Sequence, residues 1–276
     1  MKTWDESLQS APWMNKKLIL FMGKGGVGKS FLSNKVARLL AAQNKKVLLC
    51  HVLQVVEKKQ RLSQPDATAY PTLWKITLHP FDCFEEYVHL KLPVKMLAEL
   101  LVGNRVIQYF EKVAPGVREL VLLGKLWYEQ RNYDHIIVDM PSTGYALTML
   151  NTPFSYSSLI PSGAIFSDAR EMIATLSNAT TTAFVGIALA EEMPVQETLD
   201  LSEKLKKMMP SNPMHLIVNR LIKPSAALLN FKGKPHSKAI SHVQGLYQKQ
   251  LENLEKLKTQ WTAGYWIELE EKHGPL

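Results

Sequence analysis

One glycine-rich loop, set between an apolar run and an amphipathic helix, constrains the fold of this chain more than any other segment. The loop Gly23-Lys24-Gly25-Gly26-Val27-Gly28-Lys29-Ser30 fits the phosphate-binding pattern G-x-x-x-x-G-K-[ST]. Residues 18–21 predict a buried strand, and residues 31–42 place leucine and valine on one helical face. In this order, backbone N–H groups and the positive end of the helix dipole can surround a polyphosphate. A glycine-rich turn that matches by chance is the alternative.

The loop residues have separate expected roles. Glycines allow the backbone to wrap closely around phosphate oxygens, because they lack a Cβ atom. We expect the amine of Lys29 to reach the β and γ phosphates and the hydroxyl of Ser30 to hold Mg²⁺. The residues of this segment expected to contact a nucleotide are Gly25, Gly26, Val27, Gly28, Lys29, Ser30 and Phe31.

A second element of a phosphate site is expected where the apolar run 136–138 ends in Asp139. In P-loop enzymes an aspartate at the carboxyl end of such a strand orients a water molecule of Mg²⁺. Asp139 is therefore the second expected metal residue beside Ser30. Taken alone, an aspartate at this place could equally cap the following turn.

Apolar runs alternate with helical patterns along the chain, and continuous apolarity is typical of strands covered on both faces. We predict an α/β fold, a P-loop NTPase with a mostly parallel sheet between helix layers and an inserted helical subdomain. Residues 1–276 form a single domain of this kind, with the helical insert at 84–131 and a second helical segment at 146–176. The expected strands are Leu18–Phe21, Val47–Cys50, Leu73–Leu78, Ile136–Val138, Phe184–Leu189, Leu216–Val218 and Tyr265–Leu269.

Composition narrows the function classes. The 276 residues are 46% hydrophobic, enough to bury one substantial core. The longest apolar stretches are shorter than a membrane span, and residues 1–17 contain no apolar signal core, so we expect no integral membrane segment and no secretion. Cys50 and Cys83 form no C-x-x-C pair, which indicates reduced thiols in a cytoplasmic protein without structural zinc. The net charge of +8 is spread along the chain, so we expect no nucleic-acid binding.

Four segments carry a family resemblance. They are the loop Lys24-Gly25-Gly26-Val27-Gly28-Lys29-Ser30, with its extra lysine; the segment from Asp139 to Leu147, similar to the switch II sequence D-x-P-P-T-G-H-x-L; the segment from Glu191 to Thr198, which follows a strand; and Val218-Asn219-Arg220-Leu221. In this order they resemble the arsenical pump-driving ATPases (ArsA) and the related ATPase that targets tail-anchored membrane proteins, within the wider MinD/ParA class.

The resemblance implies a mechanism. Members of the family are dimers that close around two ATP molecules, so ATP or ADP with Mg²⁺ are the implied cofactors. Lys24 would reach the nucleotide of the opposite subunit and act in catalysis with Lys29 and Asp139, because a lysine at a γ-phosphate offsets developing negative charge. Asn219 and Arg220 correspond to the segment that recognises adenine.

One position departs from the family pattern. The family follows its second strand with S-T-D-P-A, whose aspartate activates the attacking water, and aligning residues 47–54 with this motif places Leu53 at the aspartate. Leucine cannot accept a proton, and losing a positioned base costs about two to four orders of magnitude in rate. His51 lies nearby in sequence, although a single histidine beside a buried strand is usually a packed or capping residue.

We therefore predict an ATP-binding, ArsA-like ATPase that works as a nucleotide-gated dimer with weak or partner-dependent hydrolysis. The second subunit would be another copy or a related ArsA-like ATPase, and a protein client is a further expectation. The alternative is a MinD/ParA-type positioning ATPase that binds a membrane surface or DNA. A scaffold that no longer binds nucleotide is the third hypothesis.

Overall fold

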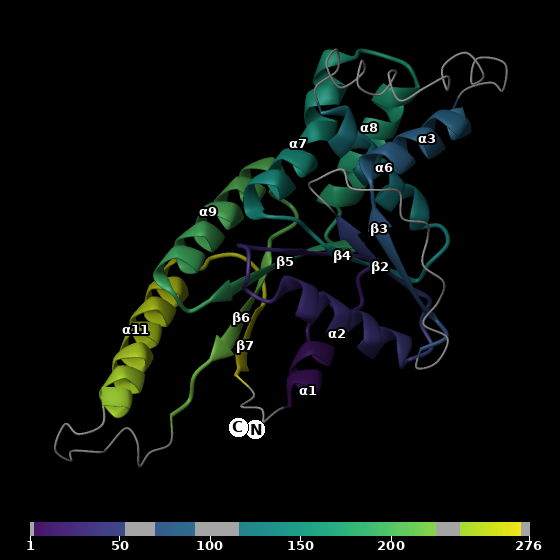
Figure 1. Ribbon diagram of the computed structural model, residues 1–276. Helices are drawn as coiled ribbons and strands as arrows, with labels where there is room; N and C mark the ends of the chain where they lie inside the picture. The colour runs from purple at the N-terminus through teal and green to yellow at the C-terminus, as the bar shows by residue number, and fades with distance from the viewer. Residues whose placement is uncertain (1–2, 53–69, 92–115, 225–237, 272–276) are drawn as a thin grey trace.

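A parallel sheet forms the centre of the computed structural model, which describes residues 3–52, 70–91, 116–224 and 238–271 (Figure 1). In the described residues seven strands pair in the order β3-β2-β4-β1-β5-β6-β7, and every pair is parallel. The strands are β1 (Leu18–Met22), β2 (Val47–Val52), β3 (Leu73–Leu78), β4 (His135–Asp139), β5 (Thr182–Leu189), β6 (His215–Leu221) and β7 (Trp266–Glu270). The predicted α/β fold with a parallel sheet between helices is confirmed.

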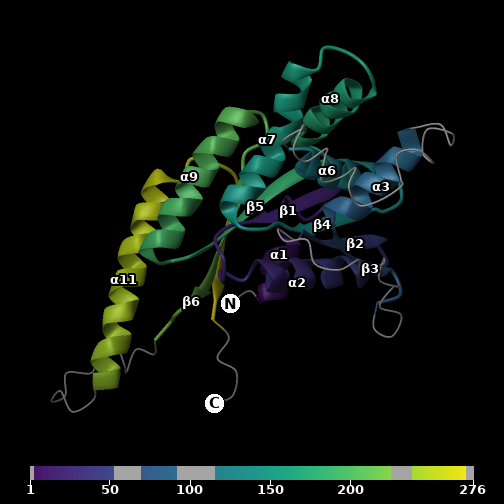
Figure 2. The same cartoon turned by 45° about the horizontal axis from the view of Figure 1, so that its top comes forward.

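Helices cover both faces of this sheet, and the views in Figures 1 and 2 agree that α1 and α2 lie opposite the larger helical layer. The helices in the described residues are α1 (Trp4–Gln9), α2 (Lys29–Ala41), α3 (Pro80–Lys91), α6 (Val117–Glu129), α7 (Thr143–Leu159), α8 (Ala164–Ser177), α9 (Glu192–Met208) and α11 (Lys238–Gln260). None of them is both long enough and apolar enough to cross a membrane.

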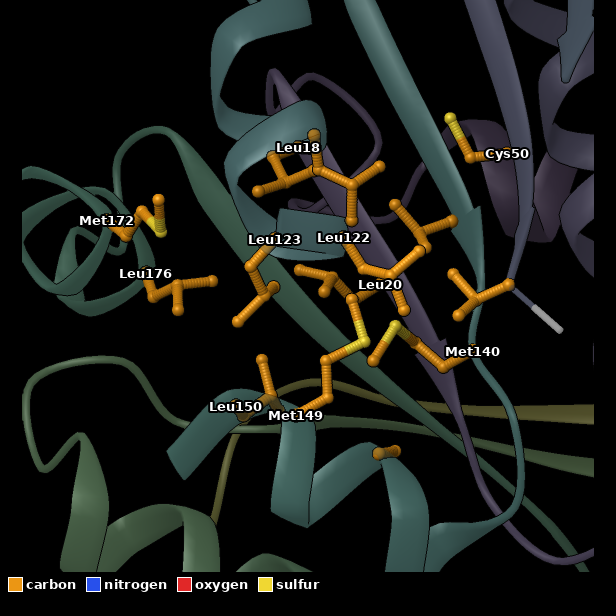
Figure 3. Packing of buried hydrophobic residues seen from close by; sticks show 14 of the residues in the cluster. Leu18, Leu20, Cys50, Leu122, Leu123, Met140, Met149, Leu150, Met172 and Leu176 are labelled. Carbon is orange, nitrogen blue, oxygen red and sulfur yellow. The ribbon is translucent and has the colours of Figure 1, made fainter. Parts of the chain in front are cut away.

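The central strand β1 supplies side chains to both faces. Ile19 and Phe21 pack in the cluster that contains the buried residues of α1 and α2. Leu18 and Leu20 pack on the other face, among methionines and leucines of α6, α7 and α8 (Figure 3). Because successive strand side chains alternate between faces, a strand covered on both sides is apolar throughout. This is the physical reason that continuous apolar runs predicted the strands.

Helices α1 and α9 help to complete the layers. The short helix α1 begins with a capping box, in which the backbone N–H of Glu6 donates to Thr3 Oγ1 and that of Thr3 donates to Glu6 Oε2. In α9, Pro194 stands in the first turn, where no backbone donor is needed. Val195 and Leu201 are buried on the face of α9 that covers the sheet.

The predicted helical insert at 84–131 is described only at its two ends. Helix α3 lies at its start and α6 at its end, whereas residues 92–115 lie outside the described residues. The insert as a subdomain therefore stays a prediction. The region 146–176 contains most of α7 and α8, which are separated at residues 160–163.

The sheet order brings three separate segments of the chain to one edge. Strand β1 lies between β4 and β5, and its last residues pair with Asp139 and Gly186. Strand β2 lies on the other side of β4, where His51 pairs in register with Asp139. Ligands of open α/β sheets bind at the carboxyl ends of the strands. The glycine loop, which leaves β1 at this edge, therefore lies beside the ends of β2 and β4.

Candidate functional site

Three glycines of the loop, Gly23, Gly26 and Gly28, have positive φ angles, and at two of them a Cβ atom would also clash. Gly23 has φ +141°, and a Cβ atom there would lie 2.4 Å from the carbonyl oxygen of Ile187 on β5. Gly28, which precedes the first residue of α2, has φ +101°, and its Cβ would lie 2.5 Å from Asn219 Nδ2. The loop is thus held closely against β5 and β6, and its conformation depends on the missing side chains.

Lys29 folds back over the loop. Its amine donates hydrogen bonds to the carbonyl oxygens of Gly23 and Lys24, both at 2.9 Å. Burial lowers the pKa of this amine from its usual value, and the carboxylates of Asp139 and Glu197 partly oppose that effect. A half-buried ammonium group between a glycine loop and a carboxylate is suited to attract a polyphosphate.

Two side chains contact the same carboxylate oxygen of Asp139. Ser30 Oγ donates a hydrogen bond of 2.6 Å to Asp139 Oδ2, and His51 Nδ1 lies 3.0 Å from the same oxygen. The other oxygen, Asp139 Oδ1, is buried and has no hydrogen-bond partner. A buried carboxylate oxygen without a partner is costly, so it indicates a position for a cation or its hydrating water. The hydroxyl and carboxylate oxygens present here fit Mg²⁺, which prefers oxygen ligands.

An open cavity of about 500 Å³ adjoins these groups. It lies at the carboxyl edge of the sheet, where Lys29 and the Ser30–Asp139 pair line it. The lining residues are Lys29, Ser30, His51, Val52, Thr77, Asp139, Met140, Pro141 and Ser142. The predicted switch II segment, which starts at Asp139, therefore borders the same space as the predicted phosphate loop.

Asn219 lies beneath the loop. It is 2% exposed, its Nδ2 donates to the carbonyl oxygen of Val27 at 2.9 Å, and its Oδ1 accepts from the backbone N–H of Arg220 at 2.9 Å. These contacts give Asn219 a direct part in fixing the loop. Arg220 is exposed and has φ +55°. Contact of either residue with adenine stays a prediction.

Lys24 and Phe31 lie at the two ends of the loop region. The Lys24 amine lies 3.4 Å from Glu197 Oε1 on α9. Phe31 is 61% exposed, and its ring meets that of Trp4 edge to face, with centroids 6.0 Å apart. Phe31 is thus open to a ligand beside Ser30, whereas Lys24 is paired within the chain.

Two residues at this site received no role from the sequence. His51 was interpreted as a packed or capping residue, yet it contacts Asp139 and lines the cavity. Glu197 belongs to the segment that resembles the family, but its pairing with Lys24 depends on how α9 lies beside the loop. The position of His51 near the end of β2 could have indicated this contact. Parallel neighbouring strands end at the same edge of the sheet, and His51 lies in register with Asp139 on β4. Leu53 lies outside the described residues.

Fold and loop together define the class of the protein. A parallel sheet, a glycine loop between its central strand and a helix, and a serine–aspartate pair at the loop are the features of a P-loop NTPase. The sequence matches the profile of the family described as Anion-transporting ATPase (ArsA) over residues 16–162. The chain belongs to this family.

Curated relatives agree with the family. The chain is 29% identical over 229 residues to ATPase BagA of Mycobacterium tuberculosis, an alignment that covers 75% of this chain and 65% of that protein. It is 29% identical over 151 residues to the putative arsenical pump-driving ATPase 2 of Aquifex aeolicus, covering 49% of each chain. The arsenical pump-driving ATPase of Acidiphilium multivorum is 27% identical over 241 residues, which are 76% of this chain and 40% of that protein. The chain therefore spans less than two thirds of these relatives' length.

Proposed function

We propose that this chain binds ATP or ADP with Mg²⁺ at the loop of residues 23–30 and works as a nucleotide-gated dimer. The observation that carries the proposal is the Ser30–Asp139 hydrogen bond at the open cavity, with Asp139 Oδ1 buried and unpartnered beside it. Within this site Lys29 would attract the phosphates, and Ser30 and Asp139 would hold the metal. The bound metal would supply charge compensation for the phosphate oxygens.

Hydrolysis by the chain alone is proposed to be weak or dependent on a partner subunit. The leucine at position 53 supports this proposal, because the motif of the resembled family has at that position the aspartate that activates water. The partner would be a second copy or a related ATPase, and Lys24 would serve the nucleotide of that partner. The names of the relatives support an ATPase, and the arsenical function in two of those names is not carried over to this chain.

Calorimetric titration of ATP and ADP, with and without Mg²⁺, tests the binding step. Replacing Lys29 with Ala should weaken ATP binding about 10- to 100-fold, because hydrogen bonds to charged groups contribute about 1.5–3 kcal/mol. Lys207→Ala is the matched control, since Lys207 is exposed on α9 and pairs only with Glu203 in the described residues. No uptake of either nucleotide by folded protein would refute the proposal.

A rate measurement tests the hydrolysis step separately. Leu53→Asp should raise ATP turnover by about two to four orders of magnitude if a missing base limits the rate. Fast turnover by the unmodified chain, with no gain on substitution, would refute impaired hydrolysis while leaving nucleotide binding intact.

Sedimentation with and without ATP and Mg²⁺ tests the dimer. We expect the mass to double only with ATP. Co-sedimentation with liposomes and with DNA distinguishes the MinD/ParA-type alternative, because ATP-dependent retention that falls steeply with salt would favour it.

A further inference from the structure

His51 is the least expected group at the metal position. Its imidazole is half-buried, lines the cavity and places Nδ1 3.0 Å from Asp139 Oδ2, the oxygen that also accepts from Ser30. The imidazole introduces a nitrogen donor into a site otherwise made of oxygen atoms.

The distance between His51 and Asp139 suits two ligands of one ion as well as a hydrogen bond. Two atoms bound at about 2.1 Å and at right angles on an octahedral ion lie about 3.0 Å apart. The observed separation of Nδ1 and Oδ2 is 3.0 Å. Asp139 Oδ1, which has no partner, gives the same carboxylate a further free ligand position.

We propose that His51 is a ligand of the divalent cation, together with Ser30 and Asp139. This inference rests on the proposed function. A neutral imidazole donates to Asp139 through Nδ1 only when its one proton is on that nitrogen. As a ligand it carries the proton on Nε2 instead, so Nδ1 offers its lone pair to the ion and no net proton is gained or lost.

This arrangement determines metal preference. Imidazole nitrogen suits the late first-row ions, whereas Mg²⁺ is held by carboxylates, hydroxyls and water. The site should therefore bind nucleotide more tightly with Co²⁺ than with Mg²⁺. Removing the nitrogen should abolish that advantage and lower the affinity for the Co²⁺ complex at least about tenfold.

Pulsed EPR of the full chain with Mn²⁺ and ADP tests the ligand directly, because bound imidazole nitrogen couples to the manganese electron spin. We expect a nitrogen signal in the unmodified protein, its loss in His51→Ser and its retention in His242→Ser, which changes an exposed histidine on α11. Calorimetry with Co·ADP and Mg·ADP gives the preference in the same three proteins.

The outcomes separate the two proposals. If ADP and Mn²⁺ bind but the unmodified chain shows no nitrogen coupling, His51 is not a ligand and the inference is overturned. This outcome is read from the unmodified protein alone, so it does not depend on whether a variant folds. The inference is also overturned if the ratio of the affinity for Co·ADP to the affinity for Mg·ADP is the same in the unmodified protein and in His51→Ser. If the folded chain takes up no nucleotide with any of these metals, the proposed function itself is refuted.

Discussion

Lys24, the extra lysine of the glycine loop, lies 3.4 Å from the carboxylate of Glu197 on α9. In the proposed dimer this lysine would reach the nucleotide of the opposite subunit, whereas within the single chain it pairs with Glu197. Glu197 also acts on Lys29: burial lowers the pKa of that amine, and the charge of Glu197, like that of Asp139, partly opposes this lowering. One carboxylate thus faces both lysines of the loop, and a triphosphate bound there would repel it.

Neutralising this carboxylate should favour the nucleotide-bound dimer. Because half-exposed ion pairs contribute about 0.2–1 kcal/mol, Glu197→Gln should lower the ATP concentration at half-dimerisation by up to about fivefold. Sedimentation velocity at a series of ATP concentrations measures this midpoint of dimerisation. Glu203→Gln is the control, because Glu203 lies on the same helix and pairs with Lys207. Identical midpoints in both variants would contradict a restraining role for Glu197.

Asn219 should prove important for stability as well as for binding. Asn219→Ala removes the buried donor to Val27 and leaves that carbonyl oxygen unsatisfied, at a cost of about 1–3 kcal/mol in unfolding free energy. Urea unfolding measures the change. Asn132→Ala, which removes only an exposed bond to Glu129, should stay within about 0.5 kcal/mol. Equal losses in the two variants would show that the loop anchor is unimportant.

Gly28→Ala should distort the glycine loop and weaken ATP binding, whereas the same substitution at Gly245 should be tolerated. The new Cβ would lie 2.5 Å from Asn219 Nδ2 at φ +101°, and such backbone strain costs about 1–3 kcal/mol. We expect weaker ATP binding and a lower melting temperature. Gly245 lies in α11 with no atom within 4 Å of its Cβ position, so Gly245→Ala should stabilise the protein by about 0.5–1 kcal/mol. A Gly28→Ala protein with unchanged ATP affinity would contradict this account of the loop.

The stability of the fold should fall in mild acid through His215. Burial, with a smaller effect of the Lys16 charge, lowers the pKa of His215 to about 4, and its Nδ1 accepts from the backbone N–H of Tyr265. The unfolded chain binds this proton near pH 6.5 and the folded chain does not, so the contribution is complete above pH 6.5 and is lost as pH falls toward 4. Between pH 7 and pH 5 it amounts to on the order of 2 kcal/mol.

Urea unfolding at several pH values checks the His215 contribution against His215→Gln. The unmodified protein should lose stability more steeply than the variant between pH 6.5 and pH 4. Parallel curves for the two proteins would assign the acid sensitivity to other groups.

The central strands β1 and β4 could be predicted because they are apolar on both faces, and the loop and Asp139 because their spacing is local. Strand β1 extends one residue beyond the predicted end, to Met22. The contacts of His51 with Asp139 and of Glu197 with Lys24 join segments 88 and 173 residues apart, counting from the residue numbers. No local pattern encodes them, since they arise from the order of the strands and the placement of α9.

Asn219 illustrates the same limit. The family resemblance predicts that this asparagine recognises adenine, which stays a prediction, but it did not predict the hydrogen bond from its amide to the loop carbonyl of Val27. Only the pairing of β5 with β6, beside the loop that follows β1, brings that carbonyl within reach.

The indole N–H of Trp4 donates to the carbonyl oxygen of Glu270, so the first helix is fastened to the last strand of the sheet. Helix α1 and strand β7 therefore lie side by side. A short peptide bridge could therefore join them, and a new opening could be cut in a surface loop, giving a circularly permuted molecule with the same sheet. The new chain termini of such a permuted protein would provide sites for fluorescent labels away from the edge of the sheet that carries the glycine loop.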